Sequence, residues 1–187
     1  MIEPGKITSG LITKIKDIRV LLMDVDGVMT AGMIVYDSNG LEIKHFNAHD
    51  GLGLKLAQSV GLKTGVLSAR DSGTIRTRAT EIGMNYLYLG HSKKLPAFIE
   101  LQQKLEMDAA HFCFIGDDLP DVPVMKAVGL AVAVNNAMPM VKEHAHYVTL
   151  KKGGDGAVRE VVELILNLQN KLEKAVQLVW EHGYAKS

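Results

Sequence analysis

The sequence predicts an α/β fold built on a doubly wound, mainly parallel sheet. Short apolar runs of strand composition, such as 20–23, 63–67 and 130–134, alternate with stretches of helical periodicity. This alternation is typical of βαβ units, whose helices cover both faces of the sheet. Polar residues directly follow several of the apolar runs, as expected where strands leave a buried sheet and ligands bind.

The composition fits one globular domain spanning residues 1–187. The chain is 47% hydrophobic and carries 21 basic and 21 acidic residues, a balance that gives no support for nucleic acid or a membrane surface as partner. No apolar run approaches the length of a membrane span, and no signal peptide is recognisable. Cys113 is the single cysteine, which excludes an intramolecular disulfide and fits a reducing compartment. We therefore expect a cytoplasmic protein.

The first predicted elements are a short helix, a strand and a hairpin. Apolar residues at helical spacing between 7 and 15 predict the helix, and the strand follows at 20–23. A β-hairpin is expected from about 32 to 46, because period-two alternation flanks Ser38-Asn39-Gly40 and Asn-Gly favours a hairpin turn. This hairpin either folds over the residues that precede it, reaches a neighbouring subunit or lies on the surface.

The middle of the chain predicts helices and strands in alternation. A helix opens at Asn47 and closes at Gly61, with Asp50 as its expected N-cap. The free backbone N–H groups at such a helix start suit an anion. Asp71 or Ser72 is expected to cap a later helix. The further elements predicted here are strands at 63–67 and 85–89, and helices at about 72–83 and from 91 onward.

The last part of the chain predicts a similar alternation and a long final helix. Asn135 and Asn136 are expected to cap a short helix that ends near His144. An amphipathic pattern from Ala157 to about Trp180 predicts one long helix within a C-terminal segment of about 156–187. The other elements expected here are strands at 111–115, 130–134 and 147–149 and a short helix at 120–128.

Acidic residues gather at the predicted carboxyl ends of the strands. Asp24 and Asp26 follow the first strand two positions apart, so both side chains lie on one face. Two carboxylates this close repel unless a cation joins them or one holds a proton, and Mg²⁺ prefers oxygen ligands. Asp117 and Asp118 follow a later strand. The expected metal ligands are therefore Asp24, Asp26, Asp117 and Asp118, the last binding directly or orienting another ligand.

These residue types suit phosphoryl transfer. Asp24 would be the nucleophile, and Asp26 would protonate the leaving alkoxide and then accept a proton from water. Ser68 would donate a hydrogen bond to a phosphoryl oxygen, while Lys94 would supply positive charge in the transition state. Each motif alone also fits a plain turn or helix cap. Their joint occurrence, in order and at strand ends, favours a catalytic site.

Asp24-Val-Asp26-Gly27, Ser68, Lys94 and Gly116-Asp117-Asp118 resemble the four motifs of the haloacid dehalogenase (HAD) superfamily of phosphotransferases. The resemblance spans residues 20–134. It implies a HAD-like fold without a large cap domain, because a hairpin is the insertion after the first strand. In capless members, neighbouring subunits close the site.

Further segments narrow the resemblance to the HAD phosphatases of 3-deoxy-D-manno-octulosonate 8-phosphate, which serve lipopolysaccharide synthesis. They include Ser92-Lys93-Lys94-Leu95, GDDLPDVPVM and the loop 153–160. The resemblance implies a Mg²⁺-dependent homotetramer acting on a small acidic sugar phosphate. The residues it implies for substrate binding are Asp26, Asn47, Ala48, His49, Asp50, Gly51, Lys55, Arg70, Arg78 and Lys94.

The sequence departs from that family at a few positions and leaves alternatives open. Ser68-Ala69 replaces the commoner Thr-Gly, and His49 and Lys55 stand where arginine is usual. One alternative is a phosphatase for another nonulosonic acid phosphate. The other is a signalling receiver domain, which also uses an aspartate that accepts phosphate. Motif order speaks against a receiver, because here the DxD comes first and the GDD late.

Overall fold

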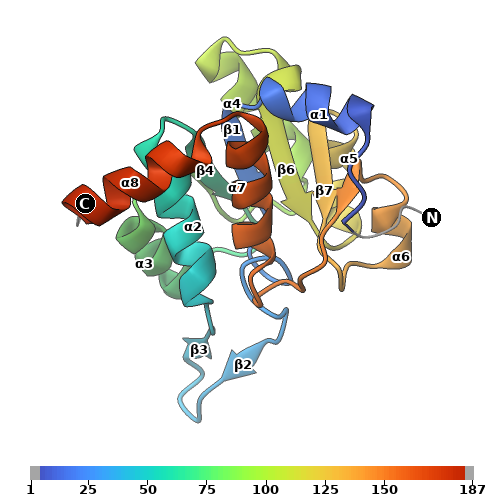
Figure 1. The fold of residues 1–187 in the computed structure, drawn as a ribbon. Helices are drawn as coiled ribbons and strands as arrows, with labels where there is room; N and C mark the ends of the chain where they lie inside the picture. Colours follow the sequence, from blue (N-terminus) through green and yellow to red (C-terminus); the bar gives the residue numbers. More distant parts are fainter. Residues whose placement is uncertain (1–4, 184–187) are drawn as a thin grey trace.

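The structure is a computed structural model that describes residues 5–183. Its centre is a six-stranded parallel sheet with the strand order β5-β4-β1-β6-β7-β8 (Figure 1). The sheet consists of β1 (Val20–Met23), β4 (Lys63–Leu67), β5 (Tyr86–Tyr88), β6 (Phe112–Gly116), β7 (Leu130–Ala133) and β8 (Tyr147–Val148). The predicted α/β fold with a parallel sheet is confirmed.

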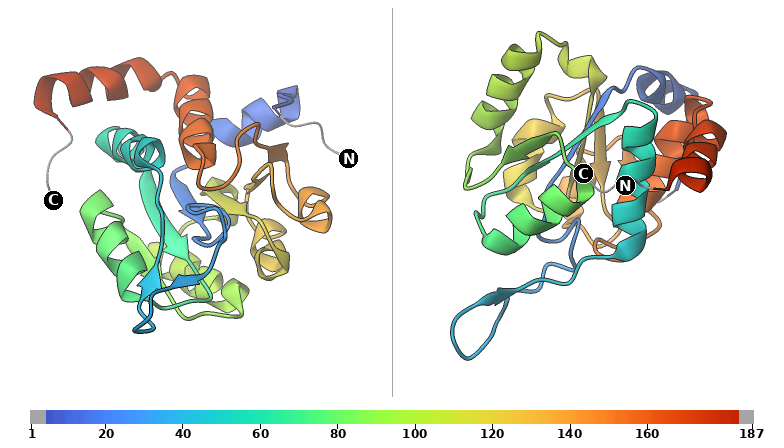
Figure 2. Two further views of the ribbon diagram at one scale, coloured as in Figure 1. Left: turned by 90° about the horizontal axis from the view of Figure 1, so that it is seen from below. Right: turned by 90° about the vertical axis from the view of Figure 1, so that its left-hand side faces the viewer.

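Helices cover both faces of this sheet (Figures 1 and 2). Helices α1, α2 and α7 pack together on one face, while α4 and α5 lie on the other. The α-helices are α1 (Ser9–Lys16), α2 (Ala48–Ser59), α3 (Gly73–Ile82), α4 (Lys94–Leu105), α5 (Val122–Met125), α6 (Pro139–Lys142), α7 (Ala157–Leu168) and α8 (Leu172–His182). Short 3-10 helices at Ala109–His111 and Leu119–Asp121 precede β6 and α5. Strand β1 is buried along its whole length, so the two layers share one continuous core.

A two-stranded antiparallel hairpin leaves the sheet after β1. Its strands β2 (Val35–Tyr36) and β3 (Glu42–Ile43) are shorter than the segment 32–46 predicted for the whole hairpin. Asp37 closes the turn by accepting the N–H groups of Asn39 and Leu41. The tip projects away from the helices at the carboxyl edge of the sheet (Figures 1 and 2).

Several predicted helix ends are confirmed, but the Asn135-Asn136 cap is wrong. Helix α3 begins after Ser72, which accepts the N–H of Ile75, and it ends at Gly83 in the left-handed region. Helix α6 begins only after Met138 and has no side-chain cap. The two asparagines are used elsewhere: Asn135 bonds to Thr149, and Asn136 accepts the N–H of Gly153. They join two loops instead of starting a helix.

The long helix predicted from Ala157 to Trp180 is also wrong, because the chain breaks it into α7 and α8. Asn170 has a φ of 55° and thus lies in the left-handed region, where asparagine is tolerated better than most residues. The break lets α8 turn and pack against α2. Trp180 on α8 remains 82% exposed. The tail beyond residue 183 lies outside the described residues.

Asp50 does not cap the helix that it was predicted to open. Asn47 is the N-cap of α2 and accepts the N–H of His49. Asp50 is buried and turns toward the start of α7, where it accepts the N–H of Arg159 at 2.8 Å. Gly156 precedes α7 and offers no side chain for capping. An aspartate from α2 thus supplies the cap that α7 lacks, and it joins the two helices.

We expect Asp50→Ala to lower the free energy of unfolding by about 1–2 kcal/mol, the usual cost of losing a helix cap. Asp50→Asn keeps an acceptor oxygen and should cost less than half as much. Urea unfolding followed by circular dichroism at 222 nm measures both values. Equal losses in the two variants would contradict a capping role for Asp50.

Candidate active site

Three neighbouring strands bring the predicted catalytic residues to one edge of the sheet. Strands β4, β1 and β6 lie side by side, and they are directly followed by Ser68, Asp24 and Asp117, respectively. The prediction that these residues meet is therefore confirmed at the level of the sheet. Gly27, at a φ of 95°, permits the Asp117 side chain to come close to the loop after β1, because a Cβ at Gly27 would lie 2.0 Å from Oδ2 of Asp117.

Lys94 is buried at the centre of this edge. Its Nζ atom lies 2.9 Å from Oδ1 of Asp24 and 2.6 Å from Oδ1 of Asp121. Asp121 in turn accepts the N–H groups of Asp117 and Asp118 with its second oxygen. Burial opposes the charge on Lys94, but Asp24 and Asp121 hold its pKa above the ordinary value. The ammonium group is therefore fixed in its charged form next to the Asp24 carboxylate.

Burial and mutual repulsion act on the two carboxylates at the strand ends. Burial raises the pKa of Asp24 to about 6, an effect that Lys94 reduces and Asp121 reinforces. Burial, together with the charges of Asp24 and Asp121, raises the pKa of Asp117 to about 8. Such a site favours any ligand that brings positive charge.

The donor atoms fit a magnesium ion between Asp24 and Asp117. Carboxylate oxygens of Asp24, Asp117 and Asp121 lie within 4.8 Å of one another. Asp121 is already bonded to Lys94 and to backbone N–H groups. Oδ1 of Asp117 is buried and has no hydrogen-bond partner in the described part of the chain. Hard oxygen donors of this kind are those that Mg²⁺ prefers.

The other two predicted metal ligands have their side chains engaged elsewhere. Asp118 is exposed and caps the following 3-10 helix by accepting the N–H of Leu119. Oδ1 of Asp26 lies 2.5 Å from Nζ of Lys44, a hairpin residue, and its Oδ2 lies 3.8 Å from Nε of Arg70. Neither side chain belongs to the carboxylate cluster within the described residues. Their direct ligation stays a prediction.

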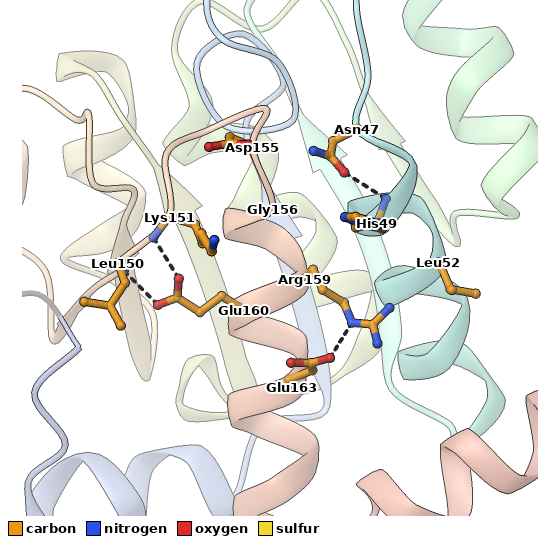
Figure 3. A pocket seen from close by; sticks show the side chains of 10 residues that line it. All are labelled: Asn47, His49, Leu52, Leu150, Lys151, Asp155, Gly156, Arg159, Glu160 and Glu163. Atoms are coloured by element: carbon orange, nitrogen blue, oxygen red, sulfur yellow. Dashed lines mark hydrogen bonds and ion pairs between the residues drawn. The ribbon is translucent and has the colours of Figure 1, made fainter.

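The predicted substrate-binding residues form separate groups. Asp26, Arg70 and Lys94 lie around the carboxylate edge. Asn47 and His49 instead line a pocket of about 800 Å³ between the starts of α2 and α7, which Figure 3 shows. The other residues that line it are Leu52, Leu150, Lys151, Asp155, Gly156, Arg159, Glu160 and Glu163. The described chain by itself thus divides these residues between two places.

The remaining predicted binding residues lie along α2 and α3. Ala48 is exposed and Lys55 is half-buried. Arg78 lies against Gly51, where a Cβ would come 2.3 Å from its Nη2. Its guanidinium carbon lies 5.8 Å from the centre of the Phe46 ring, and its Nη1 lies 3.2 Å from Glu81. Gly51 therefore gives the Arg78 side chain room beside α2.

Sequence reasoning missed Asp121, Glu42 and Lys44. Asp121 follows Asp117 by four positions in GDDLPD, and the recurrence of aspartate over one helical turn was a usable signal. Glu42 and Lys44 alternate with Leu41 and Ile43, so both point to one face of the hairpin strand. That spacing indicated a charged inner face, but nothing in the sequence identified its partner.

Comparison with known proteins gives the family. A model of the haloacid dehalogenase-like hydrolase family matches residues 67–161. The 3-deoxy-D-manno-octulosonate 8-phosphate phosphatase KdsC of Escherichia coli (strain K12) is 42% identical over 171 residues, which cover 91% of each chain. This chain belongs to the haloacid dehalogenase-like hydrolase family. The predicted resemblance to HAD phosphatases is confirmed.

Solved structures of similar HAD hydrolases share the fold. The phosphatase of the same name from Yersinia pestis has a TM-score of 0.87 at 43% identity, covering 89% of this chain and 90% of the other. A Moraxella catarrhalis phosphatase in complex with a magnesium ion, a phosphate ion and a KDO molecule also has a TM-score of 0.87, at 38% identity, covering 89% of this chain and 95% of the other.

Among residues 5–183, no helix has both the length and the apolar composition that crossing a membrane requires.

The raised pKa values of Asp24 and Asp117 predict a pH-dependent stability in EDTA. The folded state holds these protons more tightly than the unfolded state, whose Asp pKa is near 3.8, so stability should fall as pH rises from about 4 to about 8. Mg²⁺ should reverse the loss. Each 1 kcal/mol lost from the free energy of unfolding lowers the melting temperature of a chain this size by about 2–4 °C.

Asp117→Asn is the control for this pH dependence. The substitution removes one titrating carboxyl group and one metal ligand. The melting temperature of the variant should therefore change less than that of the wild type between about pH 4 and about pH 8, and it should not respond to Mg²⁺. Differential scanning fluorimetry with and without EDTA measures both effects. A wild-type protein whose Mg²⁺ response is the same at both pH values would contradict the prediction.

Proposed function

We propose that this protein is a Mg²⁺-dependent phosphomonoesterase that hydrolyses 3-deoxy-D-manno-octulosonate 8-phosphate to the free sugar acid and phosphate, in lipopolysaccharide biosynthesis. The observation that carries the proposal is the Asp24 carboxylate, held 2.9 Å from buried Lys94 beside Asp117 and followed two residues on by Asp26. A nucleophile, a positive charge, a metal-ligand pair and an acid/base group are all present. The Escherichia coli relative, 42% identical over 91% of this chain, supports the substrate.

In the first half of the reaction, Asp24 attacks the phosphorus atom of the ester. Asp26 donates a proton to the sugar oxygen as the phosphorus–oxygen bond breaks, which avoids release of a free alkoxide. The Ser68 hydroxyl donates to a phosphoryl oxygen, and Lys94 holds the Asp24 carboxylate in place and offsets developing negative charge. The products of this half are the sugar acid and an aspartyl-phosphate on Asp24.

In the second half, Asp26 takes a proton from a water molecule as its oxygen attacks the phosphorus atom of the aspartyl-phosphate. The bond between phosphorus and the Asp24 oxygen breaks, which releases phosphate and regenerates the Asp24 carboxylate. Asp24 and Asp117 would hold Mg²⁺, with Asp26 and Asp118 as further candidate ligands. The ion, when bound, screens the nucleophile from the negatively charged phosphate. The buried Asp117 oxygen without a hydrogen-bond partner in the described chain supports this assignment.

We further propose that substrate recognition uses a second copy of the chain. The acidic sugar phosphate carries two anionic groups and calls for several cations and free N–H groups. Arg70 and Lys94 lie at the carboxylate edge, whereas Asn47 and His49 line a pocket that does not include it. A homotetramer in which neighbouring subunits close each site would bring residues from Asn47 to Lys55, and Arg78, to the substrate of another subunit.

Exposed apolar side chains of the hairpin support such an assembly. Five of them in this segment are at least 42% exposed, namely Met33, Ile34, Tyr36, Leu41 and Ile43. An exposed apolar surface of this kind on a projecting segment is typical of an interface. Self-association through the hairpins would cover it and hold each hairpin next to the site of a neighbour.

Phosphate release from a panel of sugar phosphates tests the proposed reaction. We expect Mg²⁺-dependent hydrolysis of 3-deoxy-D-manno-octulosonate 8-phosphate, abolished by EDTA and reduced at least about 1,000-fold by Asp24→Asn, which removes the nucleophile. Fast hydrolysis of another nonulosonic acid phosphate instead would keep the mechanism and change the substrate. If no ester releases phosphate in a metal-dependent way, the proposed phosphatase activity is contradicted and a phospho-accepting receiver-like domain is favoured.

A matched pair of substitutions tests the hairpin interface. Ile43 on the hairpin and Ile99 on α4 are 42% and 41% exposed, so their free-chain environments are alike. We expect Ile43→Asp to shift the protein from tetramer to monomer, because a buried charge opposes association, while Ile99→Asp leaves the mass unchanged. Size-exclusion chromatography with light scattering measures the mass. A tetramer that persists in Ile43→Asp would contradict the interface.

A further inference from the structure

We propose that Lys44, on the hairpin, is a positioning residue that holds the acid/base carboxylate of Asp26; the inference rests on the proposed function. Nζ of Lys44 lies 2.5 Å from Oδ1 of Asp26, and the Lys44 side chain is only 1% exposed. A lysine is rarely buried to this extent unless it is paired. Its ammonium group is therefore committed to the site and does not reach into solvent.

The two oxygens of Asp26 have different surroundings. Oδ1 is held by Lys44. Oδ2 is buried, and among residues 5–183 it has no hydrogen-bond partner. An acid/base group needs one oxygen free to exchange a proton and a fixed orientation for the whole carboxylate. The contact with Lys44 supplies the orientation and leaves Oδ2 for the leaving oxygen or the attacking water.

Glu42 holds Lys44 in place and ties the arrangement to the hairpin. Its Oε1 atom lies 3.2 Å from Nζ of Lys44 and 2.9 Å from Nη2 of Arg70. Glu42 and Lys44 are two positions apart, so the strand directs both toward the same face. Four charged groups, two of each sign, thus form one closed network around Asp26 that leaves little net charge to bury.

Lys44 differs from Arg70, the other cation near Asp26. The Arg70 side chain is 39% exposed, and its Nε lies 3.8 Å from Oδ2, beyond hydrogen-bonding distance. Arg70 also bonds to the hydroxyl of Tyr36 at 2.8 Å. Arg70 is thus open to a bound anion, in keeping with a binding residue, whereas the Lys44 side chain is enclosed and pairs with the carboxylates of Asp26 and Glu42.

A double-mutant cycle separates positioning from a merely structural role. We expect Lys44→Met to lower kcat for the sugar phosphate by about 10–100-fold, with KM changed less than about threefold, because an acid/base group loses its orientation. In the D26N background, the same substitution should change kcat less than about twofold, since no acid/base group remains to orient. Lys104→Met, which removes an exposed lysine of α4, is the matched control and should leave kcat unchanged.

Two results would overturn the inference: wild-type kcat in Lys44→Met, or an equal loss of kcat in both backgrounds. If Lys44→Met does not fold, Glu42→Gln takes its place in the same cycle, with the same expected pattern and a smaller loss. Circular dichroism of each variant shows whether it is folded.

A readout without activity separates this inference from the proposed function. In urea unfolding, Lys44→Met should lower the midpoint more in the wild-type background than in D26N, because the Asp26 carboxylate is present only in the wild-type background. Equal shifts would overturn the Lys44–Asp26 contact whether or not the protein is an enzyme. If the wild type hydrolyses no ester, the proposed function fails, and the unfolding cycle still decides the contact.

Discussion

The repulsion among carboxylates at the carboxyl edge of the sheet is the constraint on which the rest of the site depends. Asp24, Asp117 and Asp121 come within 4.8 Å of one another in a largely buried place. Lys94 offsets part of this charge, and two backbone N–H groups offset more through Asp121. Burial, together with the negative charge that remains, raises the pKa of Asp117 to about 8. The folded chain therefore gives up stability to keep a place for a cation and a transferred phosphoryl group.

The hairpin extends this arrangement without a cap domain. Its strand β3 has two faces that serve different purposes, as period-two alternation requires. Glu42, and Lys44 just after the strand, turn toward Asp26, whereas Ile43 lies on the exposed side. A short insertion can thus complete the charge network of its own site with one face and offer an apolar surface with the other. A slip of one residue in the pairing of β2 with β3 would exchange the two faces.

The sheet and the gathering of its acidic residues were predictable, because both follow from local rules. Buried strands read as apolar runs, and parallel strands bring their carboxyl ends to one edge, so Asp24, Ser68 and Asp117 had to meet. The uses of single polar side chains were not predictable in the same way. Asp50 sits in a segment that suits an N-cap, yet it caps another helix more than 100 residues away in sequence. The break at Asn170 depends on packing of α8 against α2, which no local pattern shows.

The proposed separation of chemistry from substrate recognition follows from what each demands of the chain. Bond making needs groups fixed to within a fraction of an ångström, and the ends of buried strands provide that rigidity. Recognition of a larger acidic substrate needs reach and variety, which helix starts and hairpins provide. In this chain the pocket lined by Asn47 and His49 lies at the starts of α2 and α7, while Asp24 directly follows β1. Because the charges of the carboxylate edge depend closely on one another, a change of substrate is expected to alter the helix starts and the hairpin first.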